Sequence, residues 1–149
     1  MQTLAHFIAT CGYLGYVPYA PGTVASAVAG YMFFFVPVVL LPVALFGGLC
    51  LVAIAIWASH ITVKMLRDND PACVVIDEVV GMYVACAFLP KVWWVYLVTF
   101  LLFRLFDILK PFPIHKFEQI AYCSLGVVFD DVVAGILAHL GVWGLLLLV

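Results

Sequence analysis

The chain has 149 residues, of which 68% are hydrophobic and only 9% are charged, and its formal net charge is −2. Soluble domains carry roughly 25% charged residues, so the composition excludes an ordinary soluble protein and predicts a single membrane-embedded domain over residues 1–149. The small negative charge, without a basic stripe, excludes the electrostatic footprint of nucleic-acid binding.

The amino-terminal region combines a short apolar stretch with a segment rich in Gly and Pro that ends at Pro21 and Gly22. Thr23 is expected to be the N-cap of the first long helix. Free amide groups at such a helix start can bind an anion, although the same segment would also serve simply as a turn that begins a helix.

Five apolar segments are long enough to be predicted as membrane spans. They cover about 24–46, 49–63, 72–89, 92–109 and 125–149. Pro37 and Pro42 should kink or divide the first segment, and Gly47 with Gly48 is expected to form the turn before the second. The predicted fold class is therefore all-α, a polytopic membrane helical bundle of about five spans.

The basic residues are divided unequally between the two faces of this bundle. Alternating spans put all but one of them at the face that also holds the amino terminus: Lys64, Arg67, Arg104, Lys110 and Lys116, against Lys91 alone at the opposite face. Since positively charged loops stay in the cytoplasm, the amino terminus is predicted to be cytoplasmic.

Five carboxylates lie inside the apolar segments, all near the predicted cytoplasmic face: Asp77, Glu78, Asp107, Asp130 and Asp131. Ionisable groups inside a membrane segment are costly and by default mark a functional site that faces the bundle interior. Magnesium takes carboxylate oxygens together with water and substrate phosphate. We therefore expect one metal-dependent site at the membrane surface.

The two adjacent acid pairs lie in similar sequence, because residues 74–80 align without gaps on residues 127–133. This match predicts two like-oriented helices, and Gly81 and Gly135 would let them approach closely. Neighbouring residues on a helix point about 100° apart, so one acid of each pair is expected to face a given ion. The other acid would bind a second ion or act on water.

Arg104 and Lys110 lie three residues before and after Asp107, near one helix face. Both can bind phosphoryl oxygens beside a metal-bound carboxylate. Structural ion pairs, such as Arg104 with Asp107, are the alternative, but five acids would leave charges unmatched without a cation.

No Cys is followed by an Arg at phosphate-loop spacing, so the cysteines are expected to be small buried residues and a metal-activated water is the predicted nucleophile.

A second hypothesis is a small cation- or proton-coupled transporter that uses the same acids. Transporters place their ionisable groups near the bilayer midplane, whereas these acids gather at one face.

Four segments resemble, in order, the motif blocks of the bacterial phosphatidylglycerophosphatase A family: PYAPGTVAS, VIDEVVG, FRLFDILKPFPI and VVFDDVVAG. The resemblance implies removal of the terminal phosphate from phosphatidylglycerophosphate, with magnesium required, during phospholipid biosynthesis at the bacterial inner membrane. A soluble relative of this family is a bundle of about six helices. The resemblance therefore implies one helix beyond the five predicted spans, formed by residues 4–10 or 115–124.

The resemblance also implies roles for individual residues. It makes the five carboxylates catalytic and metal-site candidates, and it makes four residues candidates for phosphate binding: Gly22, Thr23, Arg104 and Lys110. The lipid substrate and the bilayer are the implied partners. The number of metal ions, the acid that activates water and the oligomeric state, a homo-oligomer included, are left open.

Overall fold

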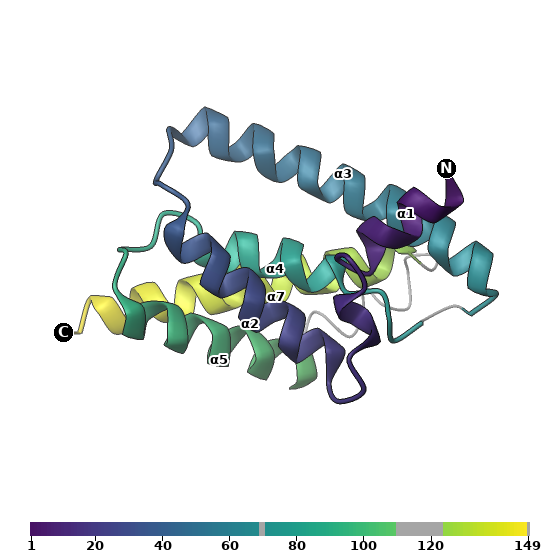
Figure 1. The fold of residues 1–149 in the computed structure, drawn as a ribbon. Helices are drawn as coiled ribbons and strands as arrows, with labels where there is room; N and C mark the ends of the chain where they lie inside the picture. Colours follow the sequence, from purple (N-terminus) through teal and green to yellow (C-terminus); the bar gives the residue numbers. More distant parts are fainter. Residues whose placement is uncertain (69–70, 110–123, 149) are drawn as a thin grey trace.

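The structure, a computed structural model, describes residues 1–68, 71–109 and 124–148. These residues form only helices and connecting turns (Figure 1). In chain order the helices are α1 (Gln2–Ala9), the 3-10 helix η1 (Leu14–Tyr16), α2 (Pro21–Phe35), α3 (Leu41–Leu66), α4 (Ile76–Cys86), α5 (Trp93–Leu109) and α7 (Ser124–Leu146). The all-α prediction is confirmed, and α1 is the additional helix expected near the amino terminus.

Helix α4 lies in the centre of the bundle, where it packs against α2, α3, α5 and α7. A side chain at Gly135 of α7 would overlap the carbonyl oxygen of Gly81 in α4. A side chain at Gly81 would in turn overlap the Phe103 ring and come within 2.8 Å of the Asp131 carbonyl oxygen. The close approach predicted for these two helices is therefore confirmed, and it depends on both glycines.

The boundary between the first two predicted segments is wrong. The helix breaks at residues 36–40, where Pro37 was expected to divide it, and Gly47 and Gly48 lie inside α3 instead of forming a turn. Pro42 lies in the first turn of α3, where its missing N–H has no helical partner to lose. At Gly48 a Cβ would stand 3.0 Å from the Tyr83 ring, so packing against α4 explains a glycine here better than a turn does.

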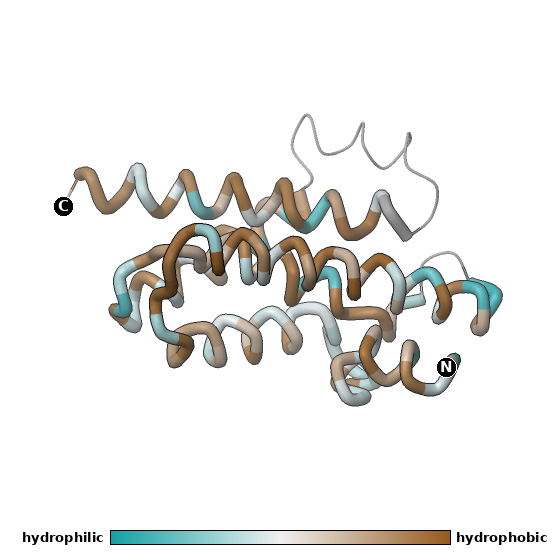
Figure 2. Tube along the Cα trace, turned by 90° about the horizontal axis from the view of Figure 1, so that it is seen from above, coloured by the Kyte–Doolittle hydropathy of each residue, from teal (hydrophilic) through white to brown (hydrophobic). Residues whose placement is uncertain are grey.

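Within residues 1–68, 71–109 and 124–148, two helices are long and apolar enough to cross a membrane, over Leu41–Leu66 and Gly126–Leu146. Figure 2 shows how hydrophobic residues predominate along the bundle. Only 11% of the most apolar window of α3 is buried in the protein, against 44% for α7, so α3 presents a large apolar surface outward. Helix α4 is roughly 16 Å long, shorter than the ~30 Å hydrocarbon core, and the number of spans stays a prediction.

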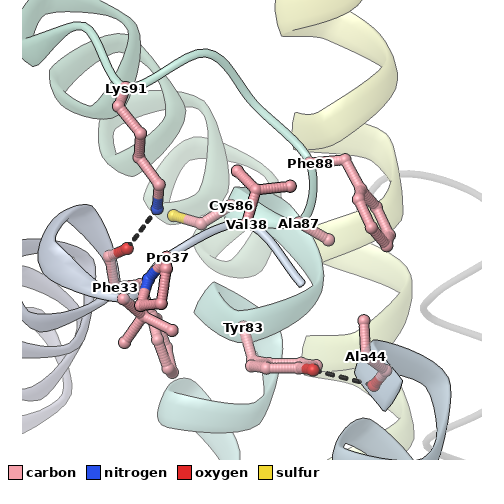
Figure 3. Close-up of a pocket in the computed structure, with 10 residues that line it drawn as sticks. Phe33, Pro37, Val38, Ala44, Tyr83, Cys86, Ala87, Phe88 and Lys91 are labelled. Atoms are coloured by element: carbon pink, nitrogen blue, oxygen red, sulfur yellow. Dashed lines mark hydrogen bonds between the residues drawn. The ribbon is translucent and has the colours of Figure 1, made fainter. Parts of the chain in front are cut away.

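The bundle end away from the acids is held by hydrogen bonds from Tyr83 and Lys91 (Figure 3). The Tyr83 hydroxyl donates to the Ala44 carbonyl at 2.8 Å, which ties α4 to α3. Lys91 Nζ donates to the Phe33 carbonyl at 2.6 Å and to the Tyr96 hydroxyl at 2.7 Å, and burial lowers the pKa of Lys91. Because the last carbonyls of a helix lack internal partners, Lys91 caps α2 and joins it to α5.

Candidate active site

A polar cavity of about 320 Å3 lies where α2 and α4 begin and α5 ends. All five carboxylates singled out from the sequence line it, together with Arg104. The described residues that line it are Ala20, Pro21, Gly22, Pro71, Ala72, Val74, Asp77, Glu78, Arg104, Asp107, Val127, Asp130 and Asp131. Helices α4, α5 and α7 thus bring polar side chains to one place, and the start of α2 lies beside them.

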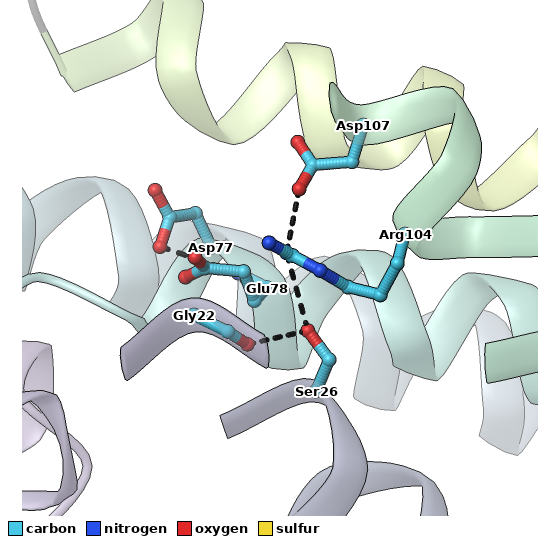
Figure 4. Close-up of polar contacts among 6 residues, drawn as sticks. All are labelled: Gly22, Ser26, Asp77, Glu78, Arg104 and Asp107. Atoms are coloured by element: carbon cyan, nitrogen blue, oxygen red, sulfur yellow. Dashed lines mark hydrogen bonds and ion pairs between the residues drawn. The ribbon is translucent and has the colours of Figure 1, made fainter. Parts of the chain in front are cut away.

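Three of the carboxylates form a compact group within this cavity. Asp77, Glu78 and Asp131 each offer one oxygen, and these oxygens lie within 4.8 Å of one another. In α4 the longer Glu78 side chain brings its carboxylate beside that of Asp77, so both acids of this pair could face one ion (Figure 4). In α7 Asp131 belongs to the group and Asp130 does not, and the expectation that one acid of a pair faces a given ion stays a prediction.

The surroundings of this group favour a cation. Asp77 and Asp131 are 4% and 5% exposed, so they are almost removed from water. Buried like charges are stable only with bound protons or a compensating cation. Glu78 Oε2 is buried and has no hydrogen-bond partner among the described residues. An all-oxygen donor set with an unsatisfied buried oxygen fits a hard cation such as magnesium.

The first turn of α4 stabilises the negative charge of the Asp77 and Glu78 carboxylates. Asp77 Oδ1 accepts a hydrogen bond from the Glu78 backbone N–H at 3.2 Å. Both acids lie in the first turn of the helix, where the macrodipole and unpaired amides favour anions. The local structure therefore stabilises the acid pair in place before any ligand binds.

Arg104 connects α5 to α2 at the edge of the cavity (Figure 4). One guanidinium N–H group donates to Asp107 Oδ2 at 2.6 Å and to Ser26 Oγ at 3.5 Å. The Ser26 hydroxyl donates to the Gly22 carbonyl at 2.7 Å. The ion-pair alternative is thus realised for Arg104 and Asp107, but this pair does not neutralise the group of three carboxylates.

The first turn of α2 forms another part of the cavity wall. Its N-cap is Ala20, with φ 46° and ψ 61°, so the expectation that Thr23 caps the helix is wrong. Pro21 follows directly, and its fixed φ suits the first helical position. A side chain at Gly22 would overlap Glu78 Oε1, so the glycine allows α2 to begin against α4. Gly22 lines the cavity, whereas Thr23 lies in the same turn without lining it.

Two contributors were missed in the sequence, and one predicted residue lies outside the described ones. Ser26 is one helical turn after Gly22 in an otherwise apolar helix, a signal that could have identified it. The left-handed conformation of Ala20 has no sequence signal, because that region usually favours glycine. Lys110, predicted to bind phosphate, lies outside the described residues.

Cys11 is the cysteine whose surroundings bear most directly on the chemistry. Its thiol donates to the Val75 carbonyl at 3.9 Å, and burial, with a contribution from the Asp77 and Glu78 carboxylates, raises its pKa to about 12. A thiol in this state is not a nucleophile near neutral pH. Cys11, Cys50, Cys73 and Cys86 are all free thiols, and Cys123 lies outside the described residues.

Comparison with known proteins identifies the family of this chain. A family model described as phosphatidylglycerophosphatase A matches residues 7–146. The phosphatidylglycerophosphatase A of Escherichia coli strain K12 is 31% identical over 137 residues, covering 89% of this chain and 78% of that protein. The protein of the same name from Haemophilus influenzae is 34% identical over 144 residues, covering 94% and 87%.

A third relative carries a different name. The "Putative phosphatidylinositol-3-phosphatase" of Bacteroides thetaiotaomicron is 33% identical over 130 residues, covering 82% of this chain and 80% of that protein. No solved structure matches the chain. Since the family match extends from α1 through α7 and includes every residue of the polar cavity, this chain belongs to the phosphatidylglycerophosphatase A family.

Proposed function

We propose that this protein is a membrane enzyme that hydrolyses the terminal phosphomonoester of phosphatidylglycerophosphate and releases phosphatidylglycerol and phosphate. The observation that carries the proposal is the single cavity in which carboxylates from α4 and α7 meet Arg104 from α5. Carboxylates with a nearby guanidinium suit the binding and hydrolysis of a phosphate ester. The names of two relatives supply the substrate.

We further propose that the enzyme uses one or two magnesium ions. Asp77, Glu78 and Asp131 would hold an ion through the oxygens that lie within 4.8 Å of one another. When bound there, magnesium would neutralise phosphoryl charge and make water a stronger nucleophile. Asp107 and Asp130 line the same cavity, so either could complete a second ion site or accept a proton from water.

The substrate phosphate would be held by the part of the wall that α5 and the start of α2 form beside this group. Arg104 can donate to phosphoryl oxygens in a fork geometry that a lysine cannot reproduce. Asp107 and Ser26 orient the guanidinium through contacts of 2.6 and 3.5 Å. The unpaired amides in the first turn of α2 would add further donors, because Gly22 lines the cavity and has no side chain to cover them.

We place the cavity at the cytoplasmic face of the bacterial inner membrane, in a multi-pass protein. The excess of Lys and Arg near the acid end of the chain's apolar segments supports this orientation. A lipid phosphate lies at that depth, while its acyl chains remain in the bilayer. The transporter hypothesis is not favoured, because the family to which the chain belongs is one of phosphatases.

The test is release of phosphate from phosphatidylglycerophosphate in detergent, with Asp77→Asn compared against Asp68→Asn. Asp68 is an exposed acid that does not line the cavity, so its variant controls for the loss of one carboxylate. We expect turnover by the native chain and the control, and none by Asp77→Asn. Full activity of Asp77→Asn would refute the assignment of the site. Phosphatidylinositol 3-phosphate is offered as a second substrate. Its hydrolysis in place of phosphatidylglycerophosphate would match the name of the Bacteroides thetaiotaomicron relative instead of the names of the other two.

A further inference from the structure

An apolar groove of about 390 Å3 runs along the seam between α2 and α5. Its lining is mainly aromatic and includes Tyr31, Phe34, Trp93, Tyr96, Leu97 and Phe100. Tyr31 and Trp93 are 69% and 71% exposed, so the groove is open to the surroundings of the bundle. None of the described residues that line it is charged.

The groove continues the seam on which the polar cavity ends. Arg104 of α5 and Ser26 of α2 meet across this seam at 3.5 Å. Phe100 lies four residues before Arg104, on the same face of α5, and it lines the groove. In α2, Ala27 directly follows Ser26 and also lines the groove. The phosphate-binding side chain and the apolar groove are therefore consecutive along one pair of helices.

The depth of the groove agrees with the position of a lipid chain. From Arg104 to Trp93 the α5 axis extends roughly 16 Å at 1.5 Å per residue. One leaflet of the hydrocarbon core is about 15 Å deep, half of the full thickness. A molecule whose phosphate lies at Arg104 could thus follow the groove for the depth of one leaflet.

We propose that the groove between α2 and α5 holds an acyl chain of the lipid whose phosphate binds at Arg104. The proposal rests on the proposed function and adds a mechanism by which the enzyme distinguishes a lipid from a soluble phosphate ester. Because the chain enters the groove from hydrocarbon and not from water, it gains affinity through van der Waals packing against the aromatic walls, without directional contacts. The apolar cavity of about 520 Å3 between α2 and α3 is the competing place, but it uses a different face of α2.

Two neighbouring residues of α2 provide a matched pair of variants. Ala27 lines the α2–α5 groove and Val28 lines the α2–α3 cavity, and both are exposed. Ala27→Phe should lower kcat/KM for dioleoyl phosphatidylglycerophosphate by about tenfold or more, while its dihexanoyl analogue changes by less than about threefold. Val28→Phe should leave both substrates within about threefold of the native values.

The opposite results would overturn the proposal. An equal loss on both substrates in Ala27→Phe would mean that the residue acts on the polar site, and a selective long-chain loss in Val28→Phe would move the chain to the α2–α3 cavity. If the native protein released no phosphate from either substrate, the proposed function would fail, whereas labelling would still test the groove.

The labelling probe is phosphatidic acid that carries a photoreactive diazirine in its acyl chain, added to the native protein in detergent. Mass spectrometry of the digested protein should find the label on groove residues such as Tyr31, Phe34, Trp93 and Leu97. Excess dioleoyl phosphatidic acid should remove the label and dioleoyl phosphatidylcholine should not, and Ala27→Phe should reduce it. Label on Val28, Met32 and Leu51, or label indifferent to both competitors, would contradict the groove assignment.

Discussion

The acid pairs of α4 and α7 have nearly the same sequence context but different structural positions. Asp77 and Glu78 occupy the first turn of α4, and both join the group of three carboxylates. Asp130 and Asp131 lie farther inside α7, and only Asp131 joins it. The position of a pair within its helix, and the rotation of that helix, therefore decide how many of its acids share one site.

The largest expected effect separates the two acids of α7. Asp131→Asn should lower kcat by about a thousandfold, or about 4 kcal/mol, because it removes a proposed metal ligand. Asp130→Asn should lower kcat by only about 10- to 100-fold, the usual cost of losing a group beside the ligands. Rates of phosphate release from phosphatidylglycerophosphate measure both. Equal losses would show that the two acids act alike and that the difference between the pairs has no functional meaning.

The next effect concerns Arg104, the cation among the described residues that line the cavity. Arg104→Lys should keep a positive charge beside Asp107 but lose the planar fork, so we expect KM to rise by about 10- to 100-fold, the loss of 1.5–3 kcal/mol for a charged hydrogen bond. Separate measurement of kcat and KM checks this. A fall in kcat with KM unchanged would mean that Arg104 acts on the reaction step and not on phosphate binding.

A smaller effect on stability tests the contact that brings the two acid pairs together. Gly135→Ala should destabilise the bundle by about 1–3 kcal/mol, because the added methyl group would overlap the Gly81 carbonyl in the neighbouring helix. Gly144→Ala in the same helix is the control, since no atom of the described residues lies within 4 Å of a Cβ there. The control should be neutral or stabilising by up to about 1 kcal/mol. Thermal unfolding in detergent compares them, and equal melting temperatures would refute the close α4–α7 contact.

The smallest effect is expected at Cys11. Its pKa of about 12 keeps the thiol protonated across the working range, so Cys11→Ala should leave kcat and its pH profile between about pH 7 and 9 unchanged. The measurement is the pH dependence of phosphate release by the native chain and the variant. If the pH profile of the Cys11→Ala variant lacked an ionisation that the native profile shows near neutral pH, the thiolate of Cys11 would have to be part of the mechanism.

Features of the site that depend on local sequence were predictable. A charge within an apolar run and a small residue one turn later are local signals, so the five carboxylates and the contact between Gly81 and Gly135 were identified before the fold was known. The spacing between Arg104 and Asp107 is a further local signal, and the family motifs strengthened the same assignment.

Features that depend on packing between helices were not predictable. Gly48 has the sequence signal of a turn, but it lies inside α3 because the Tyr83 ring of another helix occupies the space beside it. The difference between Asp130 and Asp131 depends on how α7 is rotated against α4. The contact of Ser26 with Arg104 joins residues 78 positions apart, a distance that no local pattern reports.

The most direct test of the central claim, that the carboxylates of α4 and α7 hold a cation required for hydrolysis, is a magnesium titration of phosphate release. The native chain and Asp68→Asn should be inactive after chelation and should regain activity along the same saturating curve when magnesium is added. Asp131→Asn should need much higher magnesium or stay inactive. Undiminished release by the native chain after chelation would contradict the account.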